Sequence, residues 1–266
     1  MANNKQMKTL LLLATIADAG ALFLGSKQVL TLTNGRTARV TGSGPPLVFS
    51  GGLYGFMPSV AYSHVLGDLR KTHTIVTTDG GRLARAEFEQ IADTLAAERL
   101  GLVAHSAFDP TILGSDRLEA AVLCDPACTP IVASFPPFLA APRFDVEERR
   151  VRVLFAQRAI EGEHPFVPEL FVPVLEGASV ERLEYADAGH ADLMDDFFAD
   201  AASRMGIHGI ADGRAPPLRA FGEWSAAAAP EVAKSKERKA YRAWVVARIQ
   251  EFFAKGGPLV VSTPLP

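Results

Sequence analysis

The feature that constrains the fold most is a short stretch near the middle of the chain, Leu100–Asp109. Its apolar run Leu102–Ala104 ends abruptly at His105 and Ser106, which is the pattern of a buried strand that feeds a sharp turn. A serine at the tip of such a turn is raised out of the sheet, and the next backbone N–H can face a developing oxyanion. The stretch therefore predicts a nucleophile elbow at Ser106. The alternative is an ordinary strand end that happens to contain His-Ser.

The predicted elbow departs from its usual pattern just after the serine. Small residues are expected two positions on either side of the nucleophile, and Ala104 meets this expectation whereas Phe108 does not. We expect the benzyl group of Phe108 to crowd the close approach of strand and helix. The chain also leaves room for only two helical turns between Ala107 and Gly114. The motif is thus present in outline, with an altered position and a short helix behind it.

Strands and helices alternate along most of the remaining chain. Asn34-Gly35 joins two segments of period-two alternation, Gln28–Thr33 and Arg36–Thr41, and this pattern predicts a β-hairpin. Besides the strand before Ser106, the expected strands are Leu47–Ser50, Thr74–Thr77, Leu118–Cys124, Val151–Phe155 and Val180–Tyr185, and the expected helices are Ser59–Lys71, Ala84–Arg99 and Arg238–Lys255. This order predicts an α/β fold with an N-terminal β-hairpin and a mostly parallel sheet that carries helices on both faces.

Three residues of complementary chemistry follow predicted strands, namely Ser106, Asp125 and His190. In open α/β sheets, ligands bind outside the carboxyl ends of the strands. A nucleophilic serine needs an imidazole to take its proton and a carboxylate to orient that imidazole, and the order serine, acid, histidine suits this fold class. We therefore predict a catalytic triad of these residues. Glu161 and Glu163, which follow the next strand, are alternative acids, and a surface-loop histidine is the alternative interpretation of His190.

Two backbone N–H groups are the predicted oxyanion donors, those of Ala107 and of Leu53 in the Gly-rich loop Gly51–Gly55. A simple turn is the alternative for that loop, and a phosphate site is disfavoured because no lysine lies at P-loop spacing. Asp195 and Asp196 are interpreted as helix-start charges on a solvated face. The other histidines are assigned to structure or solvent: His64, His73, His105, His164 and His208.

Composition limits the class of protein and its partners. The 266 residues are 48% hydrophobic and 21% charged, which is ordinary for one large globular domain, here predicted over residues 26–266. A net charge of −3 gives no basic footprint for nucleic acid. Cys124 and Cys128 have no His-rich segment beside them, so two thiols are favoured over a zinc site, and a disulfide would close a very small loop. The predicted chemistry needs no metal or organic cofactor.

Residues 1–25 form a separate apolar segment. Thr9–Gly25 is interrupted only by Thr15 and Asp18, and Lys5 and Lys8 precede it. This is typical of a secretory or targeting signal, and its small residues around Asp18 would suit a cleavage site. The segment is also nearly long enough to span a bilayer, although Asp18 would be costly there, and a helix packed on the domain is a third interpretation. The segment favours a membrane-associated, plastid or secreted location over the plain cytosol.

Four motifs lie in the order expected for one known family. The strand, Gly-rich loop and Tyr-Ser helix of Leu47–Leu69 come first, Cys124-Asp125-Pro126 follows a later strand, Gly189–Asp196 surrounds the histidine, and the last helix contains Tyr241. Together with the elbow, these motifs resemble the chlorophyllase branch of the α/β-hydrolases from about Gly44 to Gly256. The histidine motif, Gly-His-Ala-Asp-Leu-Met-Asp-Asp, is the most specific of them.

The resemblance implies an α/β-hydrolase fold and hydrolysis of a lipophilic carboxylic ester, in that family the phytyl ester of chlorophyll. Ser106 would be the nucleophile, His190 the general base and Asp125 the orienting acid. The sequence departs from the family at Gly51, where a histidine is usual, and at Phe108-Asp109, which replaces two glycines. These departures motivate a second hypothesis, a pseudoenzyme of this fold that binds a membrane or a membrane-protein complex, for example beside pigment–protein complexes. A lyase or transferase that uses the same triad is a third hypothesis.

Overall fold

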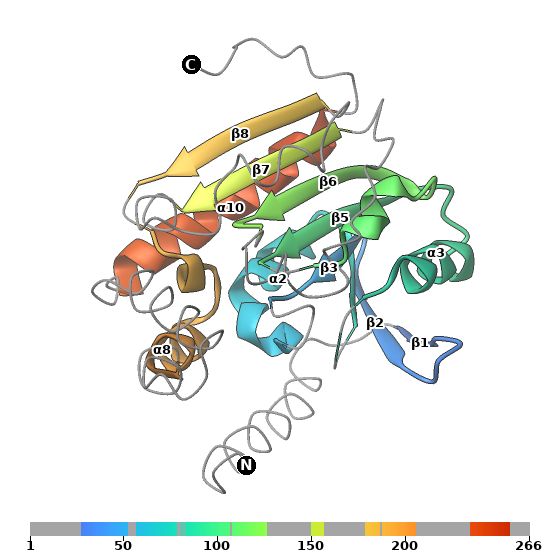
Figure 1. The fold of residues 1–266 in the computed structure, drawn as a ribbon, viewed down its shortest axis with the longest axis horizontal. Coiled ribbons are helices and arrows are strands. Elements are labelled where there is room, and N and C mark those ends of the chain that lie inside the picture. Colours follow the sequence, from blue (N-terminus) through green and yellow to red (C-terminus); the bar gives the residue numbers. More distant parts are fainter. Residues whose placement is uncertain are drawn as a thin grey trace, which may run out of the picture.

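The computed structural model describes residues 28–52, 57–78, 81, 83–106, 108–126, 150–156, 179–186, 188–205 and 235–255. Its centre is an 8-stranded sheet with the order β1-β2-β4-β3-β5-β6-β7-β8 (Figure 1). Strand β2 is antiparallel to both of its neighbours, β1 and β4, whereas every other pair of neighbouring strands is parallel. The predicted class, an α/β fold with a mostly parallel sheet, is confirmed.

The elements follow the predicted order along the chain. The strands are β1 (Gln28–Thr31), β2 (Thr37–Gly42), β3 (Pro46–Ser50), β4 (Thr74–Thr78), β5 (Leu100–His105), β6 (Leu118–Cys124), β7 (Arg150–Ala156) and β8 (Ser179–Tyr185). The α-helices are α2 (Ser63–Leu69), α3 (Arg85–Thr94), α8 (Asp196–Met205) and α10 (Ser235–Ala254), and the 3-10 helices are η1 (Ser59–Tyr62), η2 (Pro110–Gly114) and η4 (His190–Leu193).

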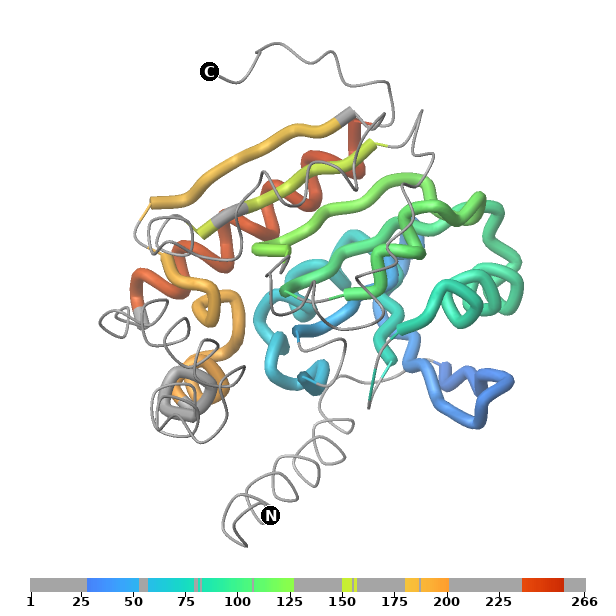
Figure 2. The backbone as a smooth tube through the Cα atoms, in the orientation of Figure 1, coloured from blue at the N-terminus to red at the C-terminus, as the bar shows by residue number. Residues whose placement is uncertain are grey.

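The predicted hairpin forms one edge of the sheet, and β8 forms the opposite edge (Figure 2). Strands β1 and β2 pair from Gln28 opposite Val40 to Thr31 opposite Thr37. Gly35 takes a φ of 80° in the connecting turn, which is a conformation that glycine adopts without steric penalty. Its N–H donates to the carbonyl of Leu32 at 2.9 Å and closes the turn.

Alternate side chains of the sheet enter two separate cores, one on each face. The core that contains Tyr62 lies under α2 and α10, and its sheet residues include Phe49, Val103 and Cys124. The opposite core lies under α3 and η2, and its sheet residues include Val48, Leu102 and Ala104. This alternation follows from the two-residue period of a strand. Because Val103 faces α2, the next residue but one, His105, faces the same side.

Two predicted helices differ from the structure at their ends. The helix expected over Ala84–Arg99 ends at Thr94, where Ala96 takes a φ of 51° and the N–H of Ala97 donates to the carbonyl of Ala92 at 2.9 Å. This left-handed closure turns the chain back toward β5. The helix expected over Ser59–Lys71 is divided into the 3-10 turn η1 and the α-helix α2.

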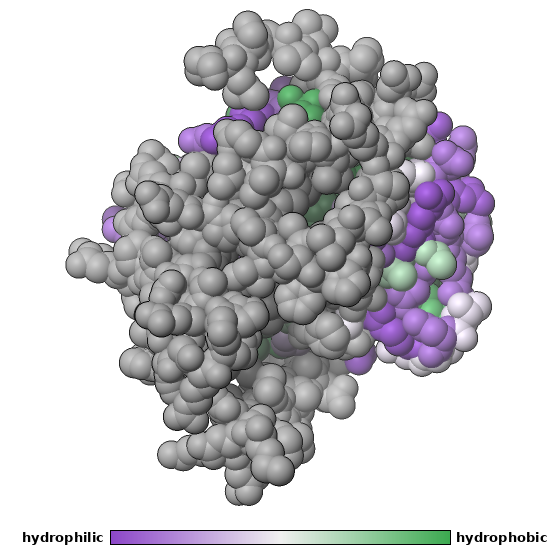
Figure 3. All heavy atoms as spheres, viewed as in Figure 1, coloured by the Kyte–Doolittle hydropathy of each residue, from purple (hydrophilic) through white to green (hydrophobic). Residues whose placement is uncertain are grey.

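Several predictions lie outside the described residues, among them the apolar segment 1–25, Leu53, Ala107, Cys128, Glu161 and Glu163. Within the described part, Cys124 is a free, buried thiol, and no helix has the length and apolar character needed to cross a bilayer. The described surface over α3 and the hairpin is largely hydrophilic (Figure 3). The large apolar side chains that are exposed among these residues are Val29 and Phe197.

Candidate active site

Ser106 stands at a strained turn directly after β5. Its φ is 62°, a left-handed conformation that costs a residue other than glycine about 1–2 kcal/mol. The neighbouring strand holds the turn in place, since the N–H of Ser106 donates to the carbonyl of Cys124 at 3.0 Å. Strain of this kind persists where the surrounding structure enforces it, and it is frequent at active sites. A left-handed residue directly after a buried strand is the backbone conformation expected of the predicted nucleophile elbow.

Phe108 does not enter the site around Ser106. Its side chain is 4% exposed and belongs to the core on the α3 face, together with Phe88 and Leu113. The short helix expected behind the serine is the 3-10 helix η2, which has 5 residues. Asp109 begins this helix, because its carboxylate accepts a hydrogen bond from the N–H of Thr111 at 3.0 Å. The altered positions of the motif thus serve the core and a helix cap.

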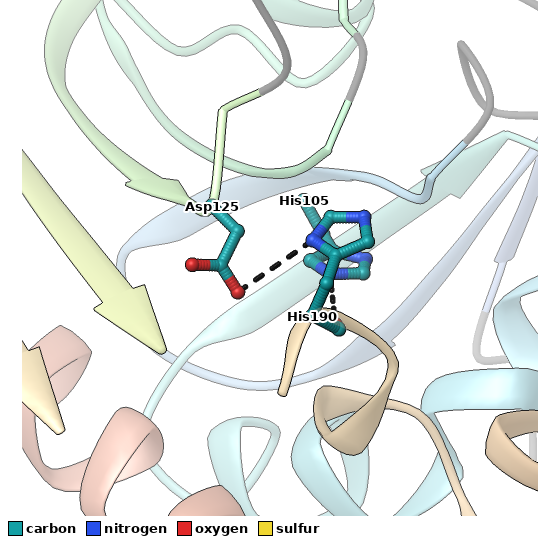
Figure 4. Close-up of side chains that lie close together, drawn as sticks. All are labelled: His105, Asp125 and His190. Atoms are coloured by element: carbon teal, nitrogen blue, oxygen red, sulfur yellow. Dashed lines mark hydrogen bonds and ion pairs between the residues drawn. The ribbon is translucent and has the colours of Figure 1, made fainter. Parts of the chain in front are cut away.

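Asp125 and His190 lie together at the carboxyl ends of the strands (Figure 4). Asp125 follows β6 with a φ of 43°, and His190 follows β8 at the start of η4. The distance from Asp125 Oδ2 to His190 Nδ1 is 3.6 Å. The other carboxylate oxygen accepts a hydrogen bond from the N–H of Ala156 at 2.7 Å, and the hydroxyl of Tyr241 donates to Oδ2 at 3.5 Å. Two of the three predicted triad residues are therefore in contact.

Burial shifts the pKa values of Asp125 and His190 in opposite directions. Desolvation raises the pKa of Asp125 to about 7, although His105 and the hydrogen bonds from Ala156 and Tyr241 act against that rise. Desolvation lowers the pKa of His190 to about 4, partly offset by the charge of Asp192. Burial thus disfavours the charged form of both groups, and the raised pKa places the loss of the Asp125 proton near neutral pH. Above that pH, an Asp125 carboxylate faces a neutral imidazole, which is the state a general base needs.

His105 is a site residue that the sequence analysis assigned to structure or solvent. Its ring stacks on that of His190, with 4.6 Å between centroids and 26° between planes (Figure 4). Its Nε2 lies 3.0 Å from the carbonyl oxygen of His190, and its Nδ1 lies 2.8 Å from the hydroxyl of Tyr62. The signal that could have found it is the two-residue period of β5, which turns His105 toward the α2 face.

The Gly-rich loop approaches the serine closely at Gly52. A Cβ atom at this position would lie 3.1 Å from the Tyr62 hydroxyl, 3.4 Å from His105 Nδ1 and 3.5 Å from Ser106 Cβ. A side chain at position 52 would therefore crowd three residues of the site, Tyr62, His105 and Ser106. The loop begins where an oxyanion donor is needed, and Leu53, the predicted donor, is the next residue.

Two aspartates of the histidine motif attach the His190 turn to α10. Asp192 accepts a hydrogen bond from the N–H of Gly189 at 2.7 Å and one from Nε of Arg238, on α10, at 2.9 Å. Asp196 accepts one from Arg242, also on α10, at 2.9 Å. The turn that carries the candidate base is consequently bonded to α10 at two points.

The interpretation of Asp195 as a solvated charge is wrong. Its carboxylate accepts hydrogen bonds from the N–H and the hydroxyl of Ser63 and lies 2.6 Å from Nδ1 of His64. These are the first two residues of α2, so Asp195 caps this helix from a distant part of the chain. The contact also fixes the His190 segment against α2.

The site also contains atoms that could bind a cation. One ligand atom from each of His105, Asp125 and His190 lies within 4.8 Å of the others. Both ring nitrogens of His105 are already at hydrogen-bond distance from a partner, so metal binding there would break one buried hydrogen bond. The arrangement suits an acid–base pair better than a metal centre.

The order and direction of the strands identify the fold. The hairpin strand β2 lies antiparallel between β1 and a run of parallel strands, with the left-handed Ser106 after β5, Asp125 after β6 and His190 after β8. The chain has the α/β-hydrolase fold. The sheet and its helices therefore agree with the fold that the sequence resemblance implied.

Comparisons with known proteins return similar structures only. No family model and no curated protein matches the sequence. A proline iminopeptidase-related protein from Thermus thermophilus is 16% identical, with a TM-score of 0.47 over 76% of this chain and 98% of that one. A putative hydrolase from Bacillus subtilis is 10% identical, with a TM-score of 0.49 over 74% of this chain and 98% of that one. At these similarities the comparisons do not assign an activity, and the chlorophyllase branch stays a prediction.

Proposed function

We propose that this α/β-hydrolase-fold protein is a serine hydrolase that cleaves a lipophilic carboxylic ester. The observation that carries the proposal is the pairing of Asp125 with His190 at 3.6 Å, at the sheet edge where Ser106 occupies its left-handed turn. A buried carboxylate beside a neutral imidazole, at the same sheet edge as a serine that ends a strand, supports nucleophilic catalysis.

The proposed reaction has two steps. The Ser106 hydroxyl adds to the ester carbonyl while His190 Nε2 takes its proton, and Asp125 stabilises the resulting imidazolium through Nδ1. The N–H groups of Leu53 and Ala107 stabilise the oxyanion. The tetrahedral intermediate then expels the alcohol, which leaves with the proton from His190, and an acyl-serine remains. Water, deprotonated by the same histidine, cleaves the acyl-serine to the acid and restores the serine.

The ester class rests on the sequence motifs. The preference for a lipophilic ester comes from the resemblance to the chlorophyllase branch, whose motifs surround Asp125 and His190. A small ladder of p-nitrophenyl esters with increasing acyl length tests this part separately, and we expect kcat/KM to rise with chain length.

A binding or structural role without catalysis is the second candidate, and the shortness of η2 favours it. A longer helix after the elbow would direct its positive N-terminal end toward the oxyanion, and a 3-10 helix of 5 residues supplies less of this potential. In this role, a membrane or a membrane-protein complex is the proposed partner.

Labelling with a fluorophosphonate probe tests the proposal. We expect the wild type to be labelled, Ser106→Ala to be unlabelled, and the labelling rate to fall as the pH drops below about 7, where Asp125 takes up a proton. Ser115→Ala is the matched control, because this buried serine donates to Glu89 on α3 and lies outside the site. A folded wild type that takes no label would overturn the hydrolase and favour the binding role.

A further inference from the structure

A row of hydrogen bonds passes through the site from the Gly-rich loop to the His190 turn. It runs from the N–H of Gly52 to the hydroxyl of Tyr62 at 2.8 Å, on to His105 Nδ1 at 2.8 Å, and from His105 Nε2 to the carbonyl of His190 at 3.0 Å. We propose that Tyr62 and His105 are positioning residues that fix the oxyanion loop, the nucleophile and the general base relative to one another. This inference rests on the proposed function.

Only one arrangement of hydrogens satisfies this row. The Gly52 N–H can only donate, so the Tyr62 oxygen accepts there and its own hydrogen is directed to His105 Nδ1. The His190 carbonyl can only accept, so His105 carries its hydrogen on Nε2. The His190 carbonyl therefore determines the tautomer of the neutral His105 ring, and the Tyr62 hydroxyl donates to the remaining lone pair on Nδ1.

Burial keeps the row in that state. The side chains of Tyr62 and His105 are 0% and 1% exposed. Desolvation raises the pKa of Tyr62 well above its usual value, and desolvation together with the nearby His190 lowers the pKa of His105 to about 3. Neither group changes its charge near neutral pH, so the direction of every hydrogen bond in the row is retained.

The row acts on each catalytic part through a separate contact. His105 holds the backbone of His190 through the carbonyl and supports the His190 ring by stacking, while Nδ1 of the His190 ring faces Asp125 (Figure 4). Since His105 directly precedes Ser106, a shift of its ring moves the elbow as well. Tyr62 holds Gly52, the residue before the predicted donor Leu53. A displacement of 1 Å in such a site can reduce a rate about 100-fold.

Tyr62→Phe is the first test, with Tyr185→Phe as its control. Nitrogen-15 NMR of the histidines should show His105 as the Nε2–H tautomer in the wild type. In Tyr62→Phe the His190 carbonyl still selects this tautomer, and the Nδ1 resonance should shift because this nitrogen loses its hydrogen-bond donor. The fluorophosphonate labelling rate of Ser106 should fall at least about tenfold, as expected for losing a buried hydrogen bond. Tyr185, a partly buried tyrosine on β8 that packs on Trp244, should leave the Nδ1 resonance of His105 and the labelling rate unchanged when its hydroxyl is removed.

Two substitutions of His105 separate its hydrogen bonds from its stacking. His105→Gln keeps a donor that can reach the His190 carbonyl, whereas His105→Phe keeps a ring but no nitrogen. We expect Gln to retain more of the labelling rate than Phe, and equal rates in the two folded variants would overturn the positioning role. An Nδ1–H tautomer in the wild type would also overturn it. Because the tautomer is read without substrate, an Nε2–H tautomer beside an unlabelled Ser106 would support the row and overturn the proposed function.

Discussion

Phe108 offers the sharpest test of how the altered elbow is built. If this side chain were a defect of the motif, its removal would improve the site. In the structure it is instead a core residue, 4% exposed and packed with Phe88 and Leu113 on the α3 face. We therefore expect Phe108→Ala to destabilise the protein without accelerating the labelling of Ser106.

The expected loss follows from the burial of the ring. Replacing a core phenylalanine by alanine costs about 3–5 kcal/mol, because transfer free energy is lost and a cavity remains. This is a large fraction of the roughly 5–15 kcal/mol that stabilises a typical protein. The midpoint of thermal unfolding should fall on the order of 10 °C for a chain of this size.

Urea denaturation followed by tryptophan fluorescence measures this loss. Phe197→Ala is the matched control, because Phe197 is 62% exposed and its removal should change the free energy of unfolding by less than about 1 kcal/mol. The reasoning would be refuted if Phe108→Ala lost no more stability than this control. It would also be refuted if the folded variant were labelled faster than the wild type.

The remaining predictions concern the acidic residues of the site. Asp192→Ala should lower the free energy of unfolding by about 2 kcal/mol, since it leaves the Gly189 N–H and the buried Arg238 each without one acceptor. The control, Asp93→Ala, removes an exposed carboxylate and should cost less than about 1 kcal/mol. Equal losses of the two variants in urea denaturation would contradict this prediction. The raised pKa of Asp125 contributes stability that is present below pH 4 and is lost as the pH rises to about 7. The lowered pKa of His190 has the opposite sign, with stability gained as the pH rises from about 4 to 6.5. Asp125→Asn should therefore make the free energy of unfolding rise more steeply between pH 4.5 and 6.5 than in the wild type, by up to about 1.4 kcal/mol per pH unit, and parallel curves would speak against the raised pKa.

The sequence by itself determined the elements and their order. The hairpin at Asn34-Gly35, the strands before Ser106 and Asp125, and the inward face of α10 all follow from periods and turn residues that lie within a few positions of one another. Because parallel strands end at one edge of a sheet, the same local patterns also predicted that Asp125 and His190 would approach each other.

Only the tertiary structure decided which side chain serves which purpose. Asp195 meets Ser63 across 132 positions of sequence, and Tyr62 meets His105 across 43, so no local pattern distinguishes these contacts from solvated charges or ordinary core residues. The same holds for Phe108, whose role depends on the face of the sheet toward which the turn directs it. Period and turn chemistry act over a few residues, whereas hydrogen bonding and desolvation depend on every group that folding brings near.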